Sequence, residues 1–136
     1  MAARSKARKR ALDLLFAAEA RGRAPAEFLD EQIAAGEAPP NDYTVTLVRG
    51  VAEHVGRIDE LIATYAEGWS LDRMPAVDRN VLRLGVFEVL WADDVPDAVA
   101  VSEAVNLVGD LSTDESPAFV NGVLGRAVRE KSQGAG

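Results

Sequence analysis

Residues 48–65 read VRGVAEHVGRIDELIATY, and this stretch sets the fold class. Its apolar side chains recur at alternating intervals of three and four residues, at Val48, Val51, Val55, Ile58, Ile62 and Tyr65. That spacing lines one face of an α-helix, whereas a half-buried strand would alternate apolar and polar residues. The sequence therefore predicts a long helix packed in a bundle. Gly50 and Gly56 within it suggest that another helix approaches closely there.

The segments before this helix also show helical spacing, and Gly and Pro residues separate them. The first helix is expected to end at Gly22, because glycine readily adopts the conformation that follows a helix. The second is expected to begin at Pro25 and to end at Gly36. Asn41 or Asp42 can then cap the long helix.

Three further helices are expected after the long one. Pro75 begins the first of them, following a joint near residues 68–74 that can hold one short extra turn at Leu71–Arg73. The Val-rich stretch VAVSEAVNLVGDL (99–111) has helical rather than alternating spacing. Ser116 is expected to cap the last helix, and Pro117 to begin it.

The first helix is expected to hold both apolar and basic residues. Leu12, Leu15 and Phe16 would anchor it in the core. Extended backwards, the same stripe reaches Arg4 and Arg8, which a core could not accept without partners. The helix is therefore expected to leave the core near residue 10, with cations around its exposed start.

Together these segments predict an all-α protein with six main helices, arranged as two three-helix bundles packed side by side in one domain. The domain is expected to cover residues 1–136. Its N-terminal bundle would span about 4–67 and its C-terminal bundle about 70–131, and residues 132–136 would form a frayed tail. With 136 residues and 48% hydrophobic composition, one domain can bury a sufficient core.

Composition excludes several classes of protein. The chain has no cysteine, so it has no disulfides, thiolate metal sites or cysteine nucleophile, and a reducing compartment such as the cytoplasm fits. No run of about 18 uncharged apolar residues is present, so no membrane span is expected. Asp13 and Glu19 interrupt the apolar stretch that a secretory signal would need. An Arg-rich presequence fits the composition of the start, but the helical pattern continues beyond it, which favours a segment of the fold.

Positive charge is concentrated at the start of the chain. The first ten residues contain five Lys or Arg and no acid, while the chain has a formal net charge of −7, so residues 11–136 carry −12. Such asymmetry indicates a local anion-binding site on an acidic body. Lys and Arg bind a nucleic-acid backbone by releasing its counterions. The alternative is a frayed tail that only keeps the protein in solution.

Residues for catalysis are few. His54 is the sole histidine and lies beside the apolar face of the long helix, without a metal-ligating partner at helical spacing. No phosphate-binding glycine motif is present. Adjacent acids such as Asp93 and Asp94 are typical of solvated surface in a chain with 22 acidic residues. We therefore expect no enzyme, no metal site and no cofactor.

Aromatic residues are the candidates for reading bases, because single-stranded RNA is recognised by stacking its unstacked bases on rings. Phe16, Tyr65, Trp69 and Phe119 are the candidates. Aromatic residues at helical spacing usually belong to a core, so each has a structural alternative. Phe119 is best placed for exposure, because it lies in the first turn of the last helix, just after a polar loop.

Four stretches in order along the chain together resemble the NusB family of transcription antitermination factors. They are RSKARKRALDLLF (4–16), VDRNVLRLGVFEVL (77–90), VPDAVAVSEAVNLV (95–108) and, most specifically, DESPAFVNGVLGR (114–126). The resemblance implies a fold of two small helical bundles and a non-enzymatic RNA-binding factor. It implies pairing with the ribosomal protein NusE and binding to the single-stranded boxA element of nascent ribosomal RNA leaders. It also implies a role in the RNA polymerase antitermination complex, which reads through terminators.

The resemblance also assigns an RNA-binding surface. Arg4, Lys6 and Arg8 match the family's arginine-rich helix start, and Lys9 and Arg10 extend that charge. The aromatic positions that the family associates with RNA are matched by Tyr65 and Phe119.

Two acidic residues are assigned to partner binding in the same way. Asp78 lies on the helix that the family presents to NusE. Glu115 matches a position linked to the balance between RNA binding and partner binding.

Two alternatives stay open. The chain could be a helical homodimeric scaffold or regulator without RNA specificity of its own. It could also be the NusB-like domain that precedes some ribosomal RNA cytosine methyltransferases, but such an enzyme would need a much longer chain with a cofactor-binding domain. Whether NusE is required for RNA affinity is left open by the sequence.

Overall fold

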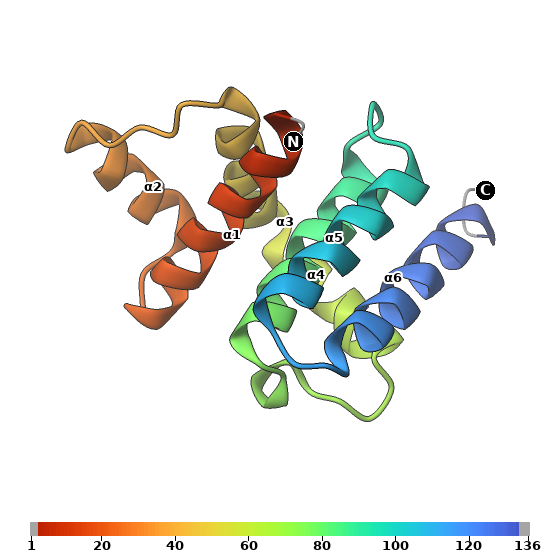
Figure 1. Cartoon of the computed structure of the whole chain (residues 1–136). Coiled ribbons are helices and arrows are strands. Elements are labelled where there is room, and N and C mark those ends of the chain that lie inside the picture. Colours follow the sequence, from red (N-terminus) through yellow and green to blue (C-terminus); the bar gives the residue numbers. More distant parts are fainter. Residues whose placement is uncertain (1–2, 134–136) are drawn as a thin grey trace. The chain divides into compact units, whose positions relative to one another are not determined.

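The computed structural model describes residues 3–133, which form six α-helices and one short 3-10 helix and contain no strand (Figure 1). The elements are α1 (Ala3–Ala20), α2 (Pro25–Ala34), α3 (Asp42–Tyr65), η1 (Leu71–Arg73), α4 (Ala76–Trp91), α5 (Asp97–Leu111) and α6 (Ser116–Gln133). The expected all-α class and the short extra turn at Leu71–Arg73 are confirmed.

The helix boundaries follow the sequence signals. Gly22 has φ +66°, a left-handed conformation that suits glycine, and its N–H donates to the carbonyl of Glu19. Pro25 begins α2. At the start of α3, the side-chain oxygen of Asn41 accepts the N–H of Tyr43 at 2.8 Å, so Asn41 rather than Asp42 provides the cap.

The N-terminal unit ends at His54 and holds α1, α2 and the first part of α3. Helices α1 and α2 pack together and bury Leu12, Leu15, Phe28 and Leu29. Two hydrogen bonds attach α1 to the beginning of α3. The Thr44 hydroxyl donates to the carbonyl of Ala7 at 3.0 Å, and the Asn41 amide donates to the carbonyl of Ala3 at 3.3 Å.

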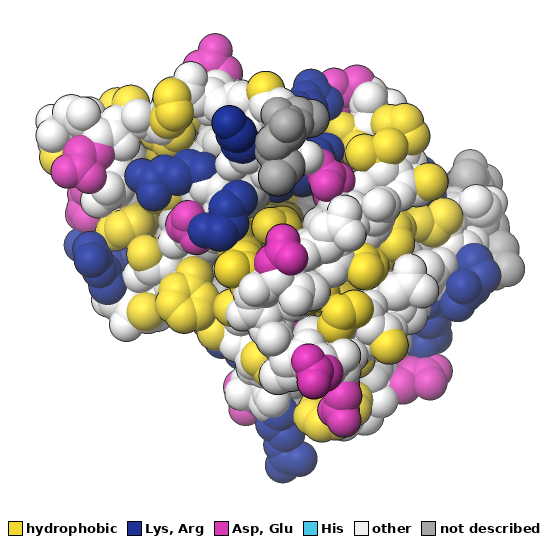
Figure 2. All heavy atoms as spheres, viewed as in Figure 1, with side chains coloured by type: hydrophobic (Ala, Val, Ile, Leu, Met, Phe, Trp, Pro, Cys, Tyr) yellow, Lys and Arg dark blue, Asp and Glu magenta, His cyan; other side chains and the backbone are white. Residues whose placement is uncertain are grey.

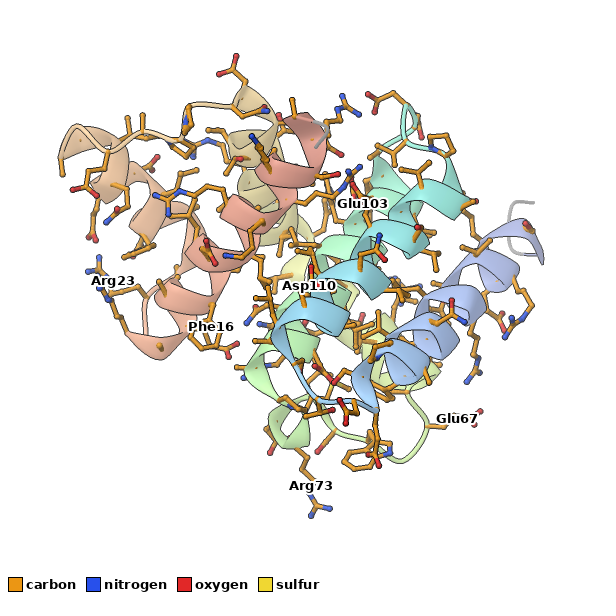
Figure 3. The ribbon with its side chains drawn as sticks, viewed as in Figure 1. Phe16, Arg23, Glu67, Arg73, Glu103 and Asp110 are labelled. Atoms are coloured by element: carbon orange, nitrogen blue, oxygen red, sulfur yellow. The ribbon has the colours of Figure 1, made fainter. Side chains whose placement is uncertain are left out.

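The apolar face of α1 differs from the expected one. Phe16, which is labelled in Figure 3, is 42% exposed, whereas Leu14 is buried. The buried stripe is centred on Ala11 and Ala18, which leaves Phe16 at its edge. The stripe also continues to Ala7, so the prediction that α1 leaves the core near residue 10 is wrong.

The C-terminal unit begins at Val55 and contains the rest of α3, then η1, α4, α5 and α6. The last three helices pack against one another in all three pairings. Helix α4 lies deepest, with nearly every residue between Asn80 and Val89 buried. A Cβ atom at Gly85 would lie 2.7 Å from Leu124, so this glycine permits the close approach of α4 and α6.

Asp59 and Arg83 join α3 to α4 within the C-terminal unit. The guanidinium of Arg83 donates to both carboxylate oxygens of Asp59, at 2.9 and 3.1 Å. It also donates to the side-chain oxygen of Asn80 at 3.0 Å. The close approach expected at Gly56 is wrong, because nothing lies within 4 Å of a Cβ atom built there.

The two ends of the chain are described only in part. Helix α1 begins at Ala3, so all five basic residues of the start are helical, and residues 1 and 2 lie outside the described range. Helix α6 continues to Gln133, and the remainder of the tail expected over 132–136 is also outside it. None of the helices in the described part of the chain is long and apolar enough to cross a membrane.

Candidate nucleic-acid interface

The first two turns of α1 carry the basic residues that the sequence assigns to RNA. Arg4 and Lys6 are exposed, and Lys9 and Arg10 are half-buried. Figure 2 shows Lys and Arg side chains on the visible face of the N-terminal unit. No acid stands in the first turn of α1, so positive charge meets the positive end of the helix dipole there. That arrangement does not stabilise the helix, and it strengthens the local attraction for an anion.

Tyr43, in the first turn of α3, orders two of these cations. The guanidinium carbon of Arg4 lies 4.0 Å from the centroid of the Tyr43 ring, and that of Arg8 lies 5.7 Å from it. Both distances fall in the range of cation–π attraction. Sequence reasoning missed Tyr43. The sequence did hold a signal for Tyr43, because it is an aromatic residue that comes just after the helix cap and lies off the apolar face of that helix.

Arg8 is placed differently from its basic neighbours. It is 4% exposed, between the buried Ala7 and the half-buried Lys9. An arginine can be buried in this way when its stem packs on apolar surface and its charge finds a partner, which the Tyr43 ring helps to provide. Arg8 therefore contributes to the packing of α1, and its contact with RNA stays a prediction.

Lys9 forms an ion pair along the helix. Its ammonium donates to both carboxylate oxygens of Asp13, at 2.8 and 3.0 Å. Both side chains are nearly half exposed, so this pair is worth little and a phosphate group could replace the carboxylate.

Tyr65 and Phe119, the two aromatic residues assigned to RNA, lie in the C-terminal unit and are both half-buried. The guanidinium of Arg126 lies 5.4 Å from the Tyr65 ring. The ring of Phe119 meets that of Trp69 edge to face, with centroids 6.3 Å apart and an interplanar angle of 63°. The structure thus places Trp69, another aromatic candidate from the sequence, against Phe119, and it adds Arg126 beside Tyr65.

Asp78, assigned to a partner surface, is 3% exposed. Its two carboxylate oxygens accept the hydroxyls of Ser112 at 2.6 Å and Ser116 at 2.8 Å. Thr113 lies 2.8 Å from the Ser116 hydroxyl and can donate to it. Asp78 therefore holds both ends of the loop between α5 and α6, and direct contact with a partner stays a prediction.

That network changes the role expected of Ser116, which is the first residue of α6 and whose hydroxyl donates to Asp78. Glu115, just before it, is exposed. The carbonyl of Glu115 accepts the N–H of Phe119, so the loop and the Phe119 ring are positioned together.

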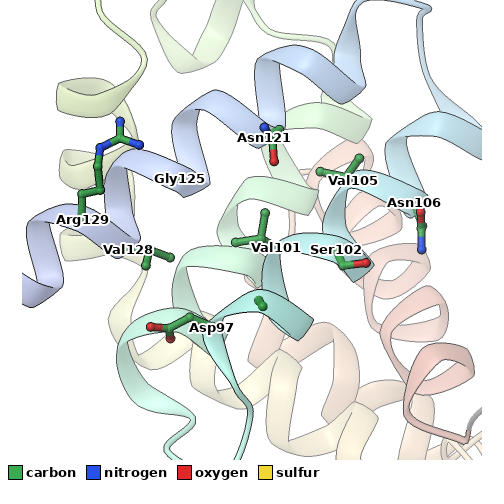
Figure 4. A pocket seen from close by; sticks show the side chains of 10 residues that line it. Asp97, Val101, Ser102, Val105, Asn106, Asn121, Gly125, Val128 and Arg129 are labelled. Atoms are coloured by element: carbon green, nitrogen blue, oxygen red, sulfur yellow. The ribbon is translucent and has the colours of Figure 1, made fainter.

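A shallow groove runs between α5 and α6 in the C-terminal unit (Figure 4). Its apolar lining comes from Val101, Val105 and Val128. Asp97, also in the lining, pairs with Lys131 at 3.0 Å. None of the residues assigned to RNA or partner binding lines this groove. Residues 3–133 contain no cluster of three or more His, Asp or Glu residues able to hold a metal ion.

Comparison with known proteins gives consistent matches over nearly the whole chain. The model of the NusB family matches residues 5–129. A transcription antitermination protein NusB from Nocardioides sp. is 72% identical over 131 residues, which cover 96% of this chain and 97% of that protein.

Solved structures agree with this match. A structure of NusB from T. maritima has a TM-score of 0.83 at 35% identity, covering 95% of this chain and 92% of that one. A chain in the crystal structure of the antitermination factors NusB and NusE in complex with dsRNA has a TM-score of 0.79 at 30% identity, covering 93% and 96%. The six-helix fold, the basic start of α1 and these similarities lead to one conclusion: the chain belongs to the NusB family.

Proposed function

We propose that this chain is a non-enzymatic transcription antitermination factor that binds RNA and pairs with the ribosomal protein NusE. The observation that carries the proposal is the start of α1, where exposed Arg4 is ordered on the Tyr43 ring within a basic segment. A related structure contains NusE and RNA, which supports both partners. The similar proteins that are named as antitermination factors support the process.

In this proposal the basic segment supplies affinity through phosphate groups. Arg4 and Lys6 are exposed, and Lys9 reaches a phosphate after releasing Asp13. Because Arg4 already rests on Tyr43, it loses less side-chain freedom when RNA binds. Contacts of this kind do not read the RNA sequence. They weaken as the salt concentration rises, because releasing counterions from the phosphates then gains less free energy.

The aromatic residues supply contact with unpaired bases. Tyr65 and Phe119 are partly exposed, as a stacking residue must be. Rings of this kind act on bases that are not paired, which favours the single-stranded boxA element of a ribosomal RNA leader. The related complex contains double-stranded RNA, so the preference for a single strand needs its own test.

The remaining charge suits a protein partner. Residues 11–136 carry −12, and a ribosomal protein such as NusE is basic, so complementary charge would speed encounter and orient the pair. The complex then acts with RNA polymerase during transcription, which places it in the cytoplasm. No step of this role requires catalysis.

The test is a binding assay with three RNAs: a single-stranded boxA-like sequence, its scrambled version, and the boxA sequence as a duplex. We expect tightest binding to the single-stranded boxA-like RNA, with weaker, strongly salt-dependent binding to the other two. If none of the three RNAs binds and the chain forms a stable homodimer, the result would instead support the alternative of a homodimeric scaffold or regulator.

A further inference from the structure

Trp69 is the most exposed large apolar side chain in the described part of the chain, at 55%. It lies in the connection between α3 and η1, in the C-terminal unit. Leaving a large ring in water forgoes the stabilisation that its burial would give. An indole combines a large apolar face with an N–H donor, so an exposed one is a candidate for contact with a ligand.

The connection that carries Trp69 is held in place on both sides. Arg126 donates to the carbonyl of Thr64 at 3.1 Å and to the carboxylate of Glu67 at 2.9 Å. Glu67 and Gly68 both have positive φ, at 32° and 83°, so the chain turns sharply directly before the indole. After it, Met74 is 4% exposed and fixes the far end.

The orientation of the Trp69 ring is also fixed, because it meets Phe119 edge to face at 6.3 Å. In such a pair the edge of one ring is directed at the other. With Trp69 more than half exposed and Phe119 half-buried, aromatic surface remains open to a ligand beside the contact.

We propose that Trp69 and Phe119 together form a stacking platform for unpaired RNA bases, with Trp69 the larger exposed ring. The proposal rests on the RNA-binding function proposed above, in which Phe119 contacts RNA. A base that stacks on Phe119 comes next to the indole, since the two rings are in contact. Stacking needs no hydrogen-bond readout, so the platform would hold a base against an aromatic face whatever its identity.

The surroundings favour a nucleic acid over a protein partner. The neighbours of the indole in the chain, Glu67, Gly68 and Ser70, are all exposed and none is apolar (Figure 3 shows Glu67 directed outward). The centre of a protein interface is depleted of charged residues and extends over contiguous apolar surface. Two rings among polar residues suit bases, whose faces are apolar and whose edges are polar.

The test uses indole fluorescence, because the chain contains two tryptophans. The Trp91→Phe variant leaves Trp69 as the sole indole, and the Trp69→Phe variant leaves Trp91 and supplies the background. Each is titrated with single-stranded boxA-like RNA, alone and with NusE, while the anisotropy of labelled RNA records binding independently. In the Trp91→Phe variant, we expect RNA to quench the fluorescence of Trp69 with the same concentration dependence as the anisotropy. The fluorescence of the Trp69→Phe variant should stay nearly unchanged.

Affinity gives a second readout. Trp69→Leu is expected to weaken binding of the single-stranded RNA about 5- to 160-fold, the usual loss for one stacking residue. Trp69→Phe, which keeps a ring, should lose less. Because the side chain is exposed, the melting temperature of both variants should stay close to that of the parent chain, and Trp91→Phe is the matched control for affinity.

Three results would overturn the inference. If RNA binds by anisotropy while Trp69 fluorescence and the affinity of Trp69→Leu stay unchanged, the platform is wrong and the RNA-binding function stands. If NusE alone quenches Trp69 and RNA does not, the ring belongs to a protein interface. If no RNA binds to the parent chain with or without NusE, the proposed function fails and the platform fails with it.

Discussion

Arg4 illustrates how one aromatic side chain can prepare a cation for binding. A free arginine on a helix start samples many rotamers, and fixing it costs free energy. The Tyr43 ring, 4.0 Å from the Arg4 guanidinium, is a neutral partner that restricts the side chain. A guanidinium carries five N–H donors in a planar fork, so it can donate to two phosphate oxygens at once.

Removing that cation gives the first prediction. Arg4→Ala should weaken RNA binding and lower the slope of log affinity against log salt by about 0.7, the value for one phosphate contact on a single strand. Arg23→Ala is the matched control, since Arg23 is also exposed in the N-terminal unit and pairs with Glu31 outside the basic segment. Salt titrations of RNA binding measure both slopes, and an unchanged slope for Arg4→Ala would remove Arg4 from the interface.

Asp78 acts on the loop between α5 and α6, and a stability measurement separates this role from partner contact. Asp78→Ala should lower the free energy of unfolding by about 2 kcal/mol, because the buried Ser116 hydroxyl and the half-buried Ser112 hydroxyl lose a charged acceptor. Asp110→Ala, at an exposed position of α5, should change it by less than about 0.5 kcal/mol. Denaturant unfolding provides the comparison. Full stability of Asp78→Ala combined with loss of NusE binding would favour the direct contact.

The burial of two side chains of α1, Phe16 and Arg8, was predicted wrongly from the sequence. Periodicity ranks Phe16 with the core because it is apolar at a suitable spacing, yet the smaller Ala11 and Ala18 define the buried centre of α1. The charge of Arg8 predicts an exposed side chain, but Arg8 is buried beside the Tyr43 ring of a different helix. The contact of Arg8 with Tyr43 joins residues 35 positions apart, so no local pattern encodes it.

At the scale of elements, the helix boundaries were readable because they depend on local chemistry. Pro25 starts α2 and Gly22 follows α1, as the sequence predicts, and Asn41 is the one of the two predicted candidates that caps α3. Packing between helices is less readable. Gly56 suggested a close approach and has none, whereas Gly85 was not singled out and lies against Leu124.

The two glycines provide a matched pair. Gly85→Ala should lower the free energy of unfolding by about 1 kcal/mol, since overpacking costs about 1–3 kcal/mol and helix propensity returns about 1 kcal/mol. Leu124 cannot swing away easily, because it is fully buried. Gly56→Ala, with open space around it, should instead raise the free energy of unfolding by about 1 kcal/mol. Opposite signs in denaturant unfolding support the tight contact of α4 and α6, and two stabilised variants would contradict it.

At the scale of the whole molecule, charge and aromatic surface are divided between the two units. The N-terminal unit holds the basic start of α1, and the C-terminal unit holds Tyr65, Trp69 and Phe119. Phosphate contacts and the stacking of unpaired bases are thus proposed for different parts of one small chain. The rest of the chain, residues 11–136, is acidic and therefore suits a basic protein partner.

The central claim is that RNA binding and NusE binding belong to one function. Its most direct test is the affinity for single-stranded boxA-like and scrambled RNA, measured at fixed salt with and without purified NusE. The account predicts that NusE binds the chain and that the complex binds boxA-like RNA more tightly than the chain alone does, with a larger difference from scrambled RNA. Unchanged affinity and discrimination on adding a NusE that binds the chain would contradict it.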